Sequence, residues 1–201
     1  MTVEVADISG YQADSLDFMK QLSKYAQSII VKLTEGSEDG LAYVNPKAFR
    51  QISNGFKVVP TVGVYHYFRG NSQKHGKQDP ENEAKWFIKN IKLAGLDKST
   101  VCVLDVEDAT LMANVTADVN VFIDYMLRQG YRHLVVYASA SWFNSKRINR
   151  QGLCQQVYIW VAAYGVDRPG VEAANAWQYT DNGHGLHVDF SYDFDGSLVG
   201  Q

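Results

Sequence analysis

Eight short apolar runs, rich in β-branched and aromatic residues, recur along the 201-residue chain, and their number and spacing restrict the fold more than any other feature. Several runs are almost continuously apolar, which is typical of parallel strands that are buried on both faces. We expect strands over residues 3–9, 28–35, 59–68, 101–107, 134–139, 157–164, 174–180 and 187–194.

Helical patterns separate the early strands. We expect five helices, over residues 14–25, 45–55, 79–95, 116–130 and 141–150. Asp79-Pro80 supplies an N-cap followed by a proline in the first turn, and Thr116 is the expected N-cap of the fourth helix. After residue 157 the connections are glycine-rich and polar and leave no room for helices.

The alternation of strands and helices predicts a parallel sheet, and eight strands predict that the sheet closes. The expected fold class is α/β, an incomplete TIM-like (β/α)5(β)3 barrel that forms one domain over residues 1–201. The alternative is an open, doubly wound sheet. Such a sheet usually has a glycine-rich phosphate loop after its first strand, but residues 7–12 contain one glycine.

Composition argues against several classes of function. A net charge of −3 disfavours nucleic-acid binding, which needs a basic face. No apolar run is long enough to span a membrane. Cys102 and Cys154 are too few for a disulfide framework, and we expect two reduced thiols. The first residues lack the basic region of a signal peptide, so we expect either that a signal has been removed or that export does not use one.

Acidic residues end several of the expected strands, at the edge where β/α barrels place their working residues. These residues are Asp7, Glu35, Asp105, Glu107 and Asp189. Asp105 and Glu107, two positions apart on a strand, point to the same face with Cα atoms roughly 6.5–7 Å apart. Their proximity raises the pKa of one carboxyl, which suits protonation of a departing sugar oxygen. Hard-cation binding, or a structural network with Lys32 or backbone amides, stays open on spacing alone.

Aromatic residues gather at the same strand ends. They are Tyr65, Tyr67, Tyr137, Trp160 and Tyr164, together with Trp177 and Tyr179, which flank Gln178. Any one of them alone is more often a core residue, but beside acids they favour a cleft for sugar rings. His66 is expected to point into the packing. His184 and His187 lack a third ligand, so we expect no metal and no cofactor.

These residues resemble glycoside hydrolase family 25, the Chalaropsis-type lysozymes that are common among phage endolysins and bacterial autolysins. The resemblance extends almost from end to end and follows the family's order. The motifs that carry it are Asp7-Ile-Ser-Gly-Tyr-Gln12, Lys32-Leu-Thr-Glu-Gly36, Gly63-Val-Tyr-His-Tyr-Phe68, Leu104-Asp-Val-Glu107, Tyr137-Ala-Ser139, Ile159-Trp-Val-Ala162, Trp177-Gln-Tyr179 and Val188-Asp189.

The resemblance implies hydrolysis of the β-1,4 bond from N-acetylmuramic acid to N-acetylglucosamine in peptidoglycan, and hence lysis of bacterial cell walls. It implies that Glu107 is the proton donor and that Asp7, Asp105 and Asp189 complete the acid cluster. Expected substrate contacts are Tyr65, Tyr67, Tyr137, Trp160, Gln178 and Glu35, although support of the rim is an equal alternative for Glu35. The family's usual Asp-x-Asn is Asp189-Phe-Ser191 here, and serine has a shorter reach.

We hypothesise net retention of the anomeric configuration, with Asp105 either as nucleophile or as a group that orients the substrate's own 2-acetamido oxygen. The second role is favoured because Asp105 lies beside the acid. The rival functions are a non-catalytic glycan-binding module, a chitin-directed hydrolase and a metal-dependent deacetylase. We expect a monomer with peptidoglycan as its partner, without the C-terminal wall-binding domain that the family commonly carries.

Overall fold

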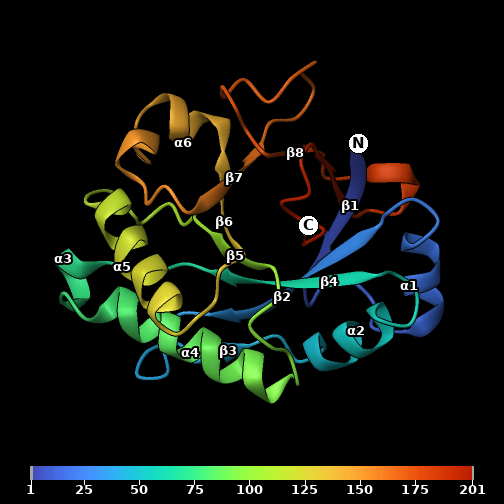
Figure 1. The fold of residues 1–201 in the computed structure, drawn as a ribbon, viewed down its shortest axis with the longest axis horizontal. Helices are drawn as coiled ribbons and strands as arrows, with labels where there is room; N and C mark the ends of the chain where they lie inside the picture. Colours follow the sequence, from blue (N-terminus) through green and yellow to red (C-terminus); the bar gives the residue numbers. More distant parts are fainter. Residues whose placement is uncertain (1, 201) are drawn as a thin grey trace.

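Eight strands close into a barrel in the computed structural model, which describes residues 2–200 (Figure 1). They are β1 (Val3–Ile8), β2 (Ser28–Glu35), β4 (Thr61–Tyr67), β5 (Cys102–Asp105), β6 (Leu134–Ser139), β7 (Val157–Ala162), β8 (Ala176–Thr180) and β9 (Asp189–Asp193). A short additional strand, β3 (Tyr43–Val44), pairs with the end of β2 outside the closed ring. The predicted α/β barrel is therefore confirmed, and the open doubly wound sheet is excluded.

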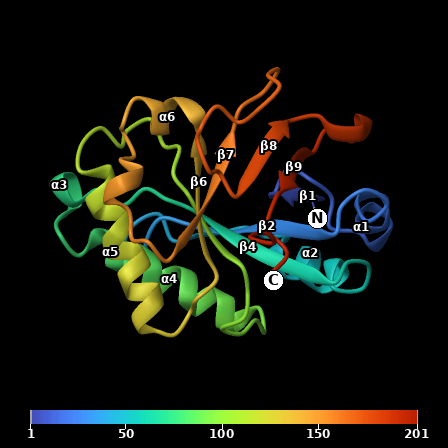
Figure 2. The same cartoon turned by 45° about the horizontal axis from the view of Figure 1, so that its top comes forward.

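Helices cover the outside of the barrel wherever the sequence leaves room for them. They are α1 (Leu16–Leu22), α2 (Ala48–Gly55), α4 (Asp79–Leu93), α5 (Val115–Arg128), α6 (Ala140–Asn144) and the single turn α3 (Ser72–His75), which was not predicted. The long helices α4 and α5 lie side by side, whereas, within the described residues, the connection between β8 and β9 contains only the 3-10 turn Gly183–Gly185 (Figures 1 and 2). None of the helices in residues 2–200 combines the length and apolar character needed to cross a membrane.

Three details of the predicted helices are wrong. Asp79 is not an N-cap: α4 begins at Asp79 itself, after Gln78, and the Asp79 carboxylate accepts a 2.8 Å hydrogen bond from the backbone N–H of Asn71. Thr116 is not an N-cap: α5 begins one residue earlier, after Asn114, and the Thr116 hydroxyl instead accepts a 2.8 Å hydrogen bond from the backbone N–H of Asn149. The helix predicted over residues 141–150 is only five residues long, because Lys146 adopts a left-handed backbone conformation (φ 60°) just after it. The 3-10 turn at Arg150–Gly152 follows separately.

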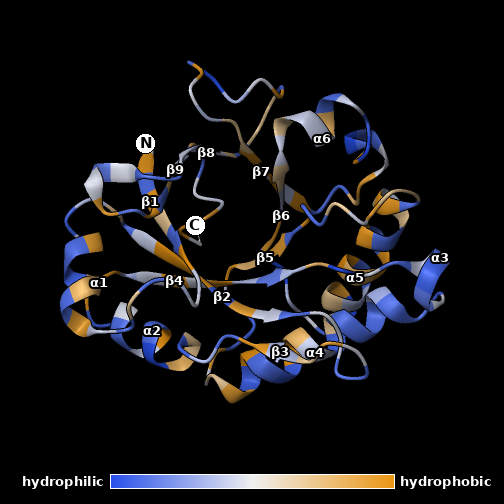
Figure 3. Cartoon of the chain, turned by 180° about the vertical axis from the view of Figure 1, so that it is seen from behind, coloured by the Kyte–Doolittle hydropathy of each residue, from blue (hydrophilic) through white to orange (hydrophobic). Residues whose placement is uncertain are grey.

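Two apolar layers hold the barrel together. Leu104 and Val106 face outwards into the large layer between strands and helices, while Val103 faces inwards into a smaller core that fills the barrel. Figure 3 shows the hydrophobic residues along the strands and on the helix faces that touch them. Near the base the inner core is tight: a Cβ on Gly63 would lie 2.6 Å from Ile30 Cδ1, so only glycine fits there without displacement.

Strand direction decides which residues meet at the top of the barrel. All neighbouring strands around the ring are parallel except β9, which runs antiparallel to both β8 and β1. The antiparallel register places Asp189, at the beginning of β9, directly opposite Asp7, near the end of β1. Asp105 at the end of β5 lies between Tyr67 of β4 and Tyr137 of β6. The strands thus bring acids and aromatic side chains to one rim.

The chain after β9 closes the opposite end of the barrel. Leu198 is fully buried in the inner core, and Asp193 holds the turn that leads to it. The buried carboxylate of Asp193 accepts hydrogen bonds from the backbone N–H groups of Gly196, Ser197, Leu198 and Val199 at 3.0, 3.0, 2.8 and 3.2 Å, and from the Ser197 hydroxyl at 3.1 Å. This carboxylate is therefore the main anchor of the closing segment.

Asp193→Asn tests that anchor. The amide replaces one acceptor oxygen with a donor that faces backbone N–H groups, and buried donors without partners are costly. We expect the free energy of unfolding, measured by urea denaturation, to fall by about 3 kcal/mol. The control is Asp17→Asn, whose carboxylate is 89% exposed and should matter little. Equal stability of the two variants would contradict the anchor.

Candidate active site

A pocket of about 60 Å³ opens at the carboxyl ends of the parallel strands. Its lining consists of Asp7, Tyr65, Val103, Asp105, Glu107, Tyr137, Trp160, Gln178 and Asp189. These include every residue predicted for the site except Tyr67 and Glu35. The barrel therefore brings the four acids of the predicted cluster together around one small space, with aromatic walls and Val103 among its apolar lining.

Asp105 and Glu107 occupy different depths of this pocket. Asp105 is the last residue of β5 and is 6% exposed, and its Oδ1 atom is buried without a hydrogen-bond partner among the described residues. Glu107 lies beyond the strand, not on it as predicted, and its side chain reaches solvent at the pocket mouth. The two carboxyls still line the same pocket, one at its base and one at its entrance.

Burial and neighbouring acidic groups raise the pKa values of this pair. Burial raises the pKa of Asp105 well above its ordinary value, and the charge of Glu107 adds to that effect against the opposing charge of Lys32. The pKa of Glu107 is also raised, mainly because protein atoms exclude water, with Asp108 adding to the shift and Lys32 reducing it. A protonated carboxylic acid at a pocket mouth can donate its proton to a bound molecule.

Asp7 and Asp189 form a second acid pair across β1 and β9. Burial raises the pKa of Asp7 well above its ordinary value, and the neighbouring charge of Asp189 raises it further. Burial also raises the pKa of Asp189, to about 6, although a hydrogen bond from Asp7 lowers it in part. Asp7 thus holds its proton more firmly and donates a hydrogen bond to Asp189.

Gln178 connects the acids to the aromatic wall. Its Nε2 atom donates a 2.8 Å hydrogen bond to Asp7 Oδ2, and its Oε1 atom accepts hydrogen bonds from the hydroxyls of Tyr137, at 2.8 Å, and Tyr164. Tyr164 was expected among the rim aromatics but not as a site residue. Gln178 is buried, so these bonds satisfy its polar atoms and fix the position of Asp7.

Trp160, one of the residues that line the pocket, is held in place by Ser191. The indole Nε1–H donates a 3.0 Å hydrogen bond to Ser191 Oγ, and the ring meets Tyr137 edge to face with centroids 4.9 Å apart. Ser191 is the residue that departs from the Asp-x-Asn pattern. In this chain its short side chain is committed to positioning Trp160.

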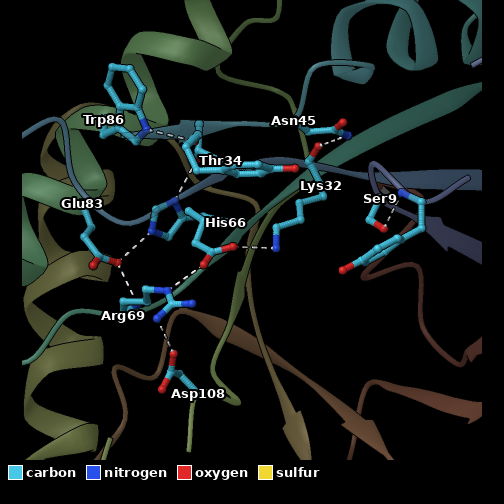
Figure 4. Close-up of polar contacts among 12 residues, drawn as sticks. Ser9, Lys32, Thr34, Asn45, His66, Arg69, Glu83, Trp86 and Asp108 are labelled. Carbon is cyan, nitrogen blue, oxygen red and sulfur yellow. Dashed lines mark hydrogen bonds and ion pairs between the residues drawn. The ribbon is translucent and has the colours of Figure 1, made fainter. Parts of the chain in front are cut away.

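Glu35 and Tyr67 lie beside the pocket in a charged cluster with Lys32 and two residues that sequence reasoning missed, Arg69 and Asp108. Figure 4 shows the ion pair between Arg69 and Asp108. Lys32 Nζ lies 2.8 Å from Glu35 Oε2 and 4.6 Å from the centre of the Tyr67 ring. Arg69 pairs with both Glu35 and Asp108. Arg69 and Asp108 directly follow the strands predicted over residues 59–68 and 101–107, and that position is the signal that could have identified them.

The ion pairs change the acidity of Glu35. Burial raises its pKa, but hydrogen bonds from Lys32 and Arg69 outweigh burial and leave the pKa below its ordinary value. Glu35 is therefore a stable anion that holds two cations. Support of the rim and contact with substrate both stay predictions for Glu35.

The histidines lie outside the pocket. His66 is fully buried, as predicted, and its ring nitrogens lie 2.8 Å from Thr34 Oγ1 and Glu83 Oε2. His184 stacks on Tyr25 with ring centroids 3.8 Å apart. Within residues 2–200, no three His, Cys, Asp or Glu side chains are arranged to hold a metal ion.

Asp189→Asn tests the raised pKa of Asp189. Because that pKa rises from 3.8 to about 6, the folded protein binds this proton more tightly than the unfolded chain does. The resulting stability is complete below about pH 4 and is lost as the pH rises through about 6. Relative to wild type, the variant's free energy of unfolding should therefore increase over this interval and then level off. Urea denaturation at a series of pH values measures it.

The control for that series is Asp167→Asn, a substitution in an exposed loop. A difference between Asp189→Asn and wild type that does not vary with pH would show that Asp189 titrates normally.

Comparison with known proteins shows the same fold in solved structures. The bacterial lysozyme from Streptomyces coelicolor superimposes with a TM-score of 0.75 at 24% identity, covering 94% of this chain and 90% of the other. The catalytic domain of endolysin ply40, from a bacteriophage of Listeria monocytogenes, gives a TM-score of 0.78 at 24% identity, covering 99% and 96%.

Sequence relatives lead to a family. The chain is 29% identical over 195 residues to the autolytic lysozyme of Clostridium acetobutylicum, covering 92% of this chain and 54% of the relative. It is 26% identical over 196 residues to lysozyme M1 of Streptomyces globisporus, covering 90% and 63%. The chain thus spans less than two thirds of either relative. The sequence model of glycosyl hydrolases family 25 matches residues 6–187, and the chain belongs to that family.

Proposed function

We propose that this chain hydrolyses the β-1,4 bond from N-acetylmuramic acid to N-acetylglucosamine in peptidoglycan and thereby lyses bacterial cell walls. The observation that carries the proposal is the pocket in which Asp105 and Glu107 meet with raised pKa values. Family membership supports it, and both sequence relatives are named lysozymes. The site is built from one chain, and we propose that residues 1–201 act as a single, monomeric catalytic domain.

Glu107 is the general acid in this proposal. Its place at the pocket mouth lets it reach the oxygen that joins two sugars, and its raised pKa keeps it protonated at a pH where an exposed glutamate is ionised. Proton transfer to the departing oxygen removes the need to expel an alkoxide. After the leaving sugar departs, the same carboxylate takes a proton from the attacking water.

Asp105 orients the substrate's 2-acetamido group in this proposal. Its unpartnered Oδ1 can accept the acetamido N–H, and that contact turns the carbonyl oxygen towards the anomeric carbon. The carbonyl oxygen attacks as the glycosidic bond breaks, which forms a cyclic oxazolinium ion. Water then opens the ring from the other side, so two inversions give net retention.

In this scheme the aromatic residues and the Asp7–Asp189 pair bind the sugar and hold it in position. Tyr65, Tyr137 and Trp160 offer apolar surface for sugar rings. Tyr67 and Glu35 contact Lys32 and hold its ammonium group at the side of the pocket.

Glu107→Gln is the direct test of the acid. The amide keeps the shape of the side chain but cannot donate an acidic proton. We expect the rate of lysis, followed as the loss of turbidity of purified cell walls, to fall by roughly 10²–10⁴-fold. The melting temperature and glycan binding should stay near wild type.

The matched control is Glu38→Gln, because Glu38 is a half-exposed glutamate that pairs with Lys89 away from the pocket. That variant should lyse normally. Turnover retained in Glu107→Gln would move the acid elsewhere, and a wild-type protein that binds walls without clearing them would favour a binding module.

The anomeric configuration of fresh product tests the route. Proton NMR of soluble glycan fragments during cleavage should first show the β-anomer, which mutarotation later mixes with α. An α-anomer at the earliest times would contradict both routes. A glycosyl ester trapped on Asp105 would contradict assistance by the acetamido group and make Asp105 the nucleophile.

A further inference from the structure

We infer that Arg69 is a positioning residue for Glu107: its guanidinium bridges Glu35 and Asp108 and so holds the segment that carries the acid at the pocket mouth. The inference rests on the proposed function, because it gives Arg69 a part in that reaction. It does not require Arg69 to contact the glycan.

The segment that carries Glu107 needs such support because it is not part of a strand. β5 ends at Asp105, and the N–H of Val106 donates a 2.9 Å hydrogen bond to the carbonyl of Tyr137. Beyond Val106, side chains order the loop. Asp108 Oδ1 accepts hydrogen bonds from the N–H and hydroxyl of Thr110 at 2.8 and 2.6 Å. The other oxygen, Oδ2, lies 3.1 Å from Arg69 Nη1.

Arg69 is itself fixed to a buried polar network (Figure 4). Its backbone N–H donates a 2.9 Å hydrogen bond to Glu83 Oε2, and the same oxygen lies 2.8 Å from His66 Nε2. Glu83 belongs to α4 and is 2% exposed, and His66 is fully buried. The preceding N–H, of Phe68, donates to the carbonyl of Asp105 at 2.9 Å. The base of the Arg69 side chain is therefore tied to both α4 and β5.

The guanidinium then joins two separate strand ends. Arg69 Nε lies 2.6 Å from Glu35 Oε1, while Lys32 pairs with the other oxygen of the same carboxylate. Arg69 Nη1 pairs with Asp108. The carboxylates are only 12% and 8% exposed, although Arg69 is 46% exposed. An ordinary surface ion pair contributes little, but loss of Arg69 leaves two poorly hydrated anions without their shared cation. A lysine ammonium has one charged nitrogen and cannot reproduce the fork.

The bridge also affects the charge around Glu107. Glu107 is faced by Lys32 from β2, Asp7 from β1, Asp105 from β5, Asp189 from β9, the adjacent Asp108, and the phenols of Tyr65, Tyr67 and Tyr137. Arg69 compensates the charge of Asp108. Without that compensation the Asp108 anion acts fully on Glu107 and raises the pKa of the acid. Because Glu107 must be protonated to act, the alkaline limb of the pH profile moves to higher pH.

The test compares Arg69→Lys and Arg69→Gln with wild type on soluble, uncrosslinked peptidoglycan chains. Both variants should lose the bridge, and we expect kcat to fall by roughly tenfold to a hundredfold with KM within about twofold of wild type. The alkaline limb should stay in place for Arg69→Lys, which keeps the charge, and should move upwards for Arg69→Gln. The control is Arg128→Gln, which removes an exposed arginine that pairs with Glu81 on the helices.

Other results would overturn the inference. A higher KM with unchanged kcat would make Arg69 a glycan-binding residue. If both variants kept the wild-type kcat and pH profile, Arg69 would have no part in the reaction. If Arg69→Lys alone behaved like wild type, the positive charge of Arg69 would be sufficient and the bridge would not be needed. Carbon-13 NMR titration of Glu107 in wild type and Arg69→Gln reads the charge effect without turnover. It keeps this inference testable even if the wild-type protein fails to cleave peptidoglycan, a result that would reject the proposed function instead.

Discussion

Burial of like charges in one small pocket is the constraint on which the rest of the site depends. Four carboxyls line a space of about 60 Å³, and water that would normally stabilise their charges is largely excluded. The pocket can exist only if several of these groups hold protons or find partners. Gln178 and the Asp7–Asp189 hydrogen bond supply partners on one side, and Lys32 supplies positive charge on the other. Ionisation of these buried groups therefore costs stability as the pH rises, and the same burial raises the pKa of Glu107.

Asp105 and Glu107 differ in their depth in the pocket and in what holds them in position. Asp105 lies on a strand and is buried, so its position is set by the sheet. Glu107 lies past the strand end, where it can meet a large polymer but needs other side chains to hold its loop. Arg147 supports the far side of that loop: its guanidinium donates hydrogen bonds to the carbonyls of Leu111 and Ala109 at 2.7 and 2.9 Å. A rigid base and a well-supported entrance agree with the proposed action on an extended glycan.

The sequence predicts those parts of this arrangement that depend on local pattern. Continuous apolar runs identify the strands, and the adjacency of Asp105 and Glu107 along the chain identifies the central pair. The end of the first strand also identifies Asp7. Asp189 reaches the same rim for a reason that the local pattern does not record, because it begins β9, which runs antiparallel to both neighbouring strands. The roles of these residues stay predictions.

Other features depend on contacts that no local pattern records. The bridge from Arg69 to Glu35 and Asp108 joins three strand ends, and its partners are 34 and 39 positions away along the chain. The end of β9 and the segment after it carry two acids in the sequence, Asp193 and Asp195, and no local pattern shows that Asp193 is buried and holds the turn. Thr116 is an error of the opposite kind, because the local pattern predicts a capping role that the structure does not show. Its hydroxyl makes a tertiary hydrogen bond, and Asn114 is the residue that precedes α5.

The bond that is cleaved tests the central claim most directly. Cell walls digested with the wild-type protein, reduced with borohydride and analysed by mass spectrometry should yield fragments that end in reduced N-acetylmuramic acid. Fragments that end in reduced N-acetylglucosamine, loss of acetyl groups without chain cleavage, or activity on chitin oligomers with none on walls would contradict the account.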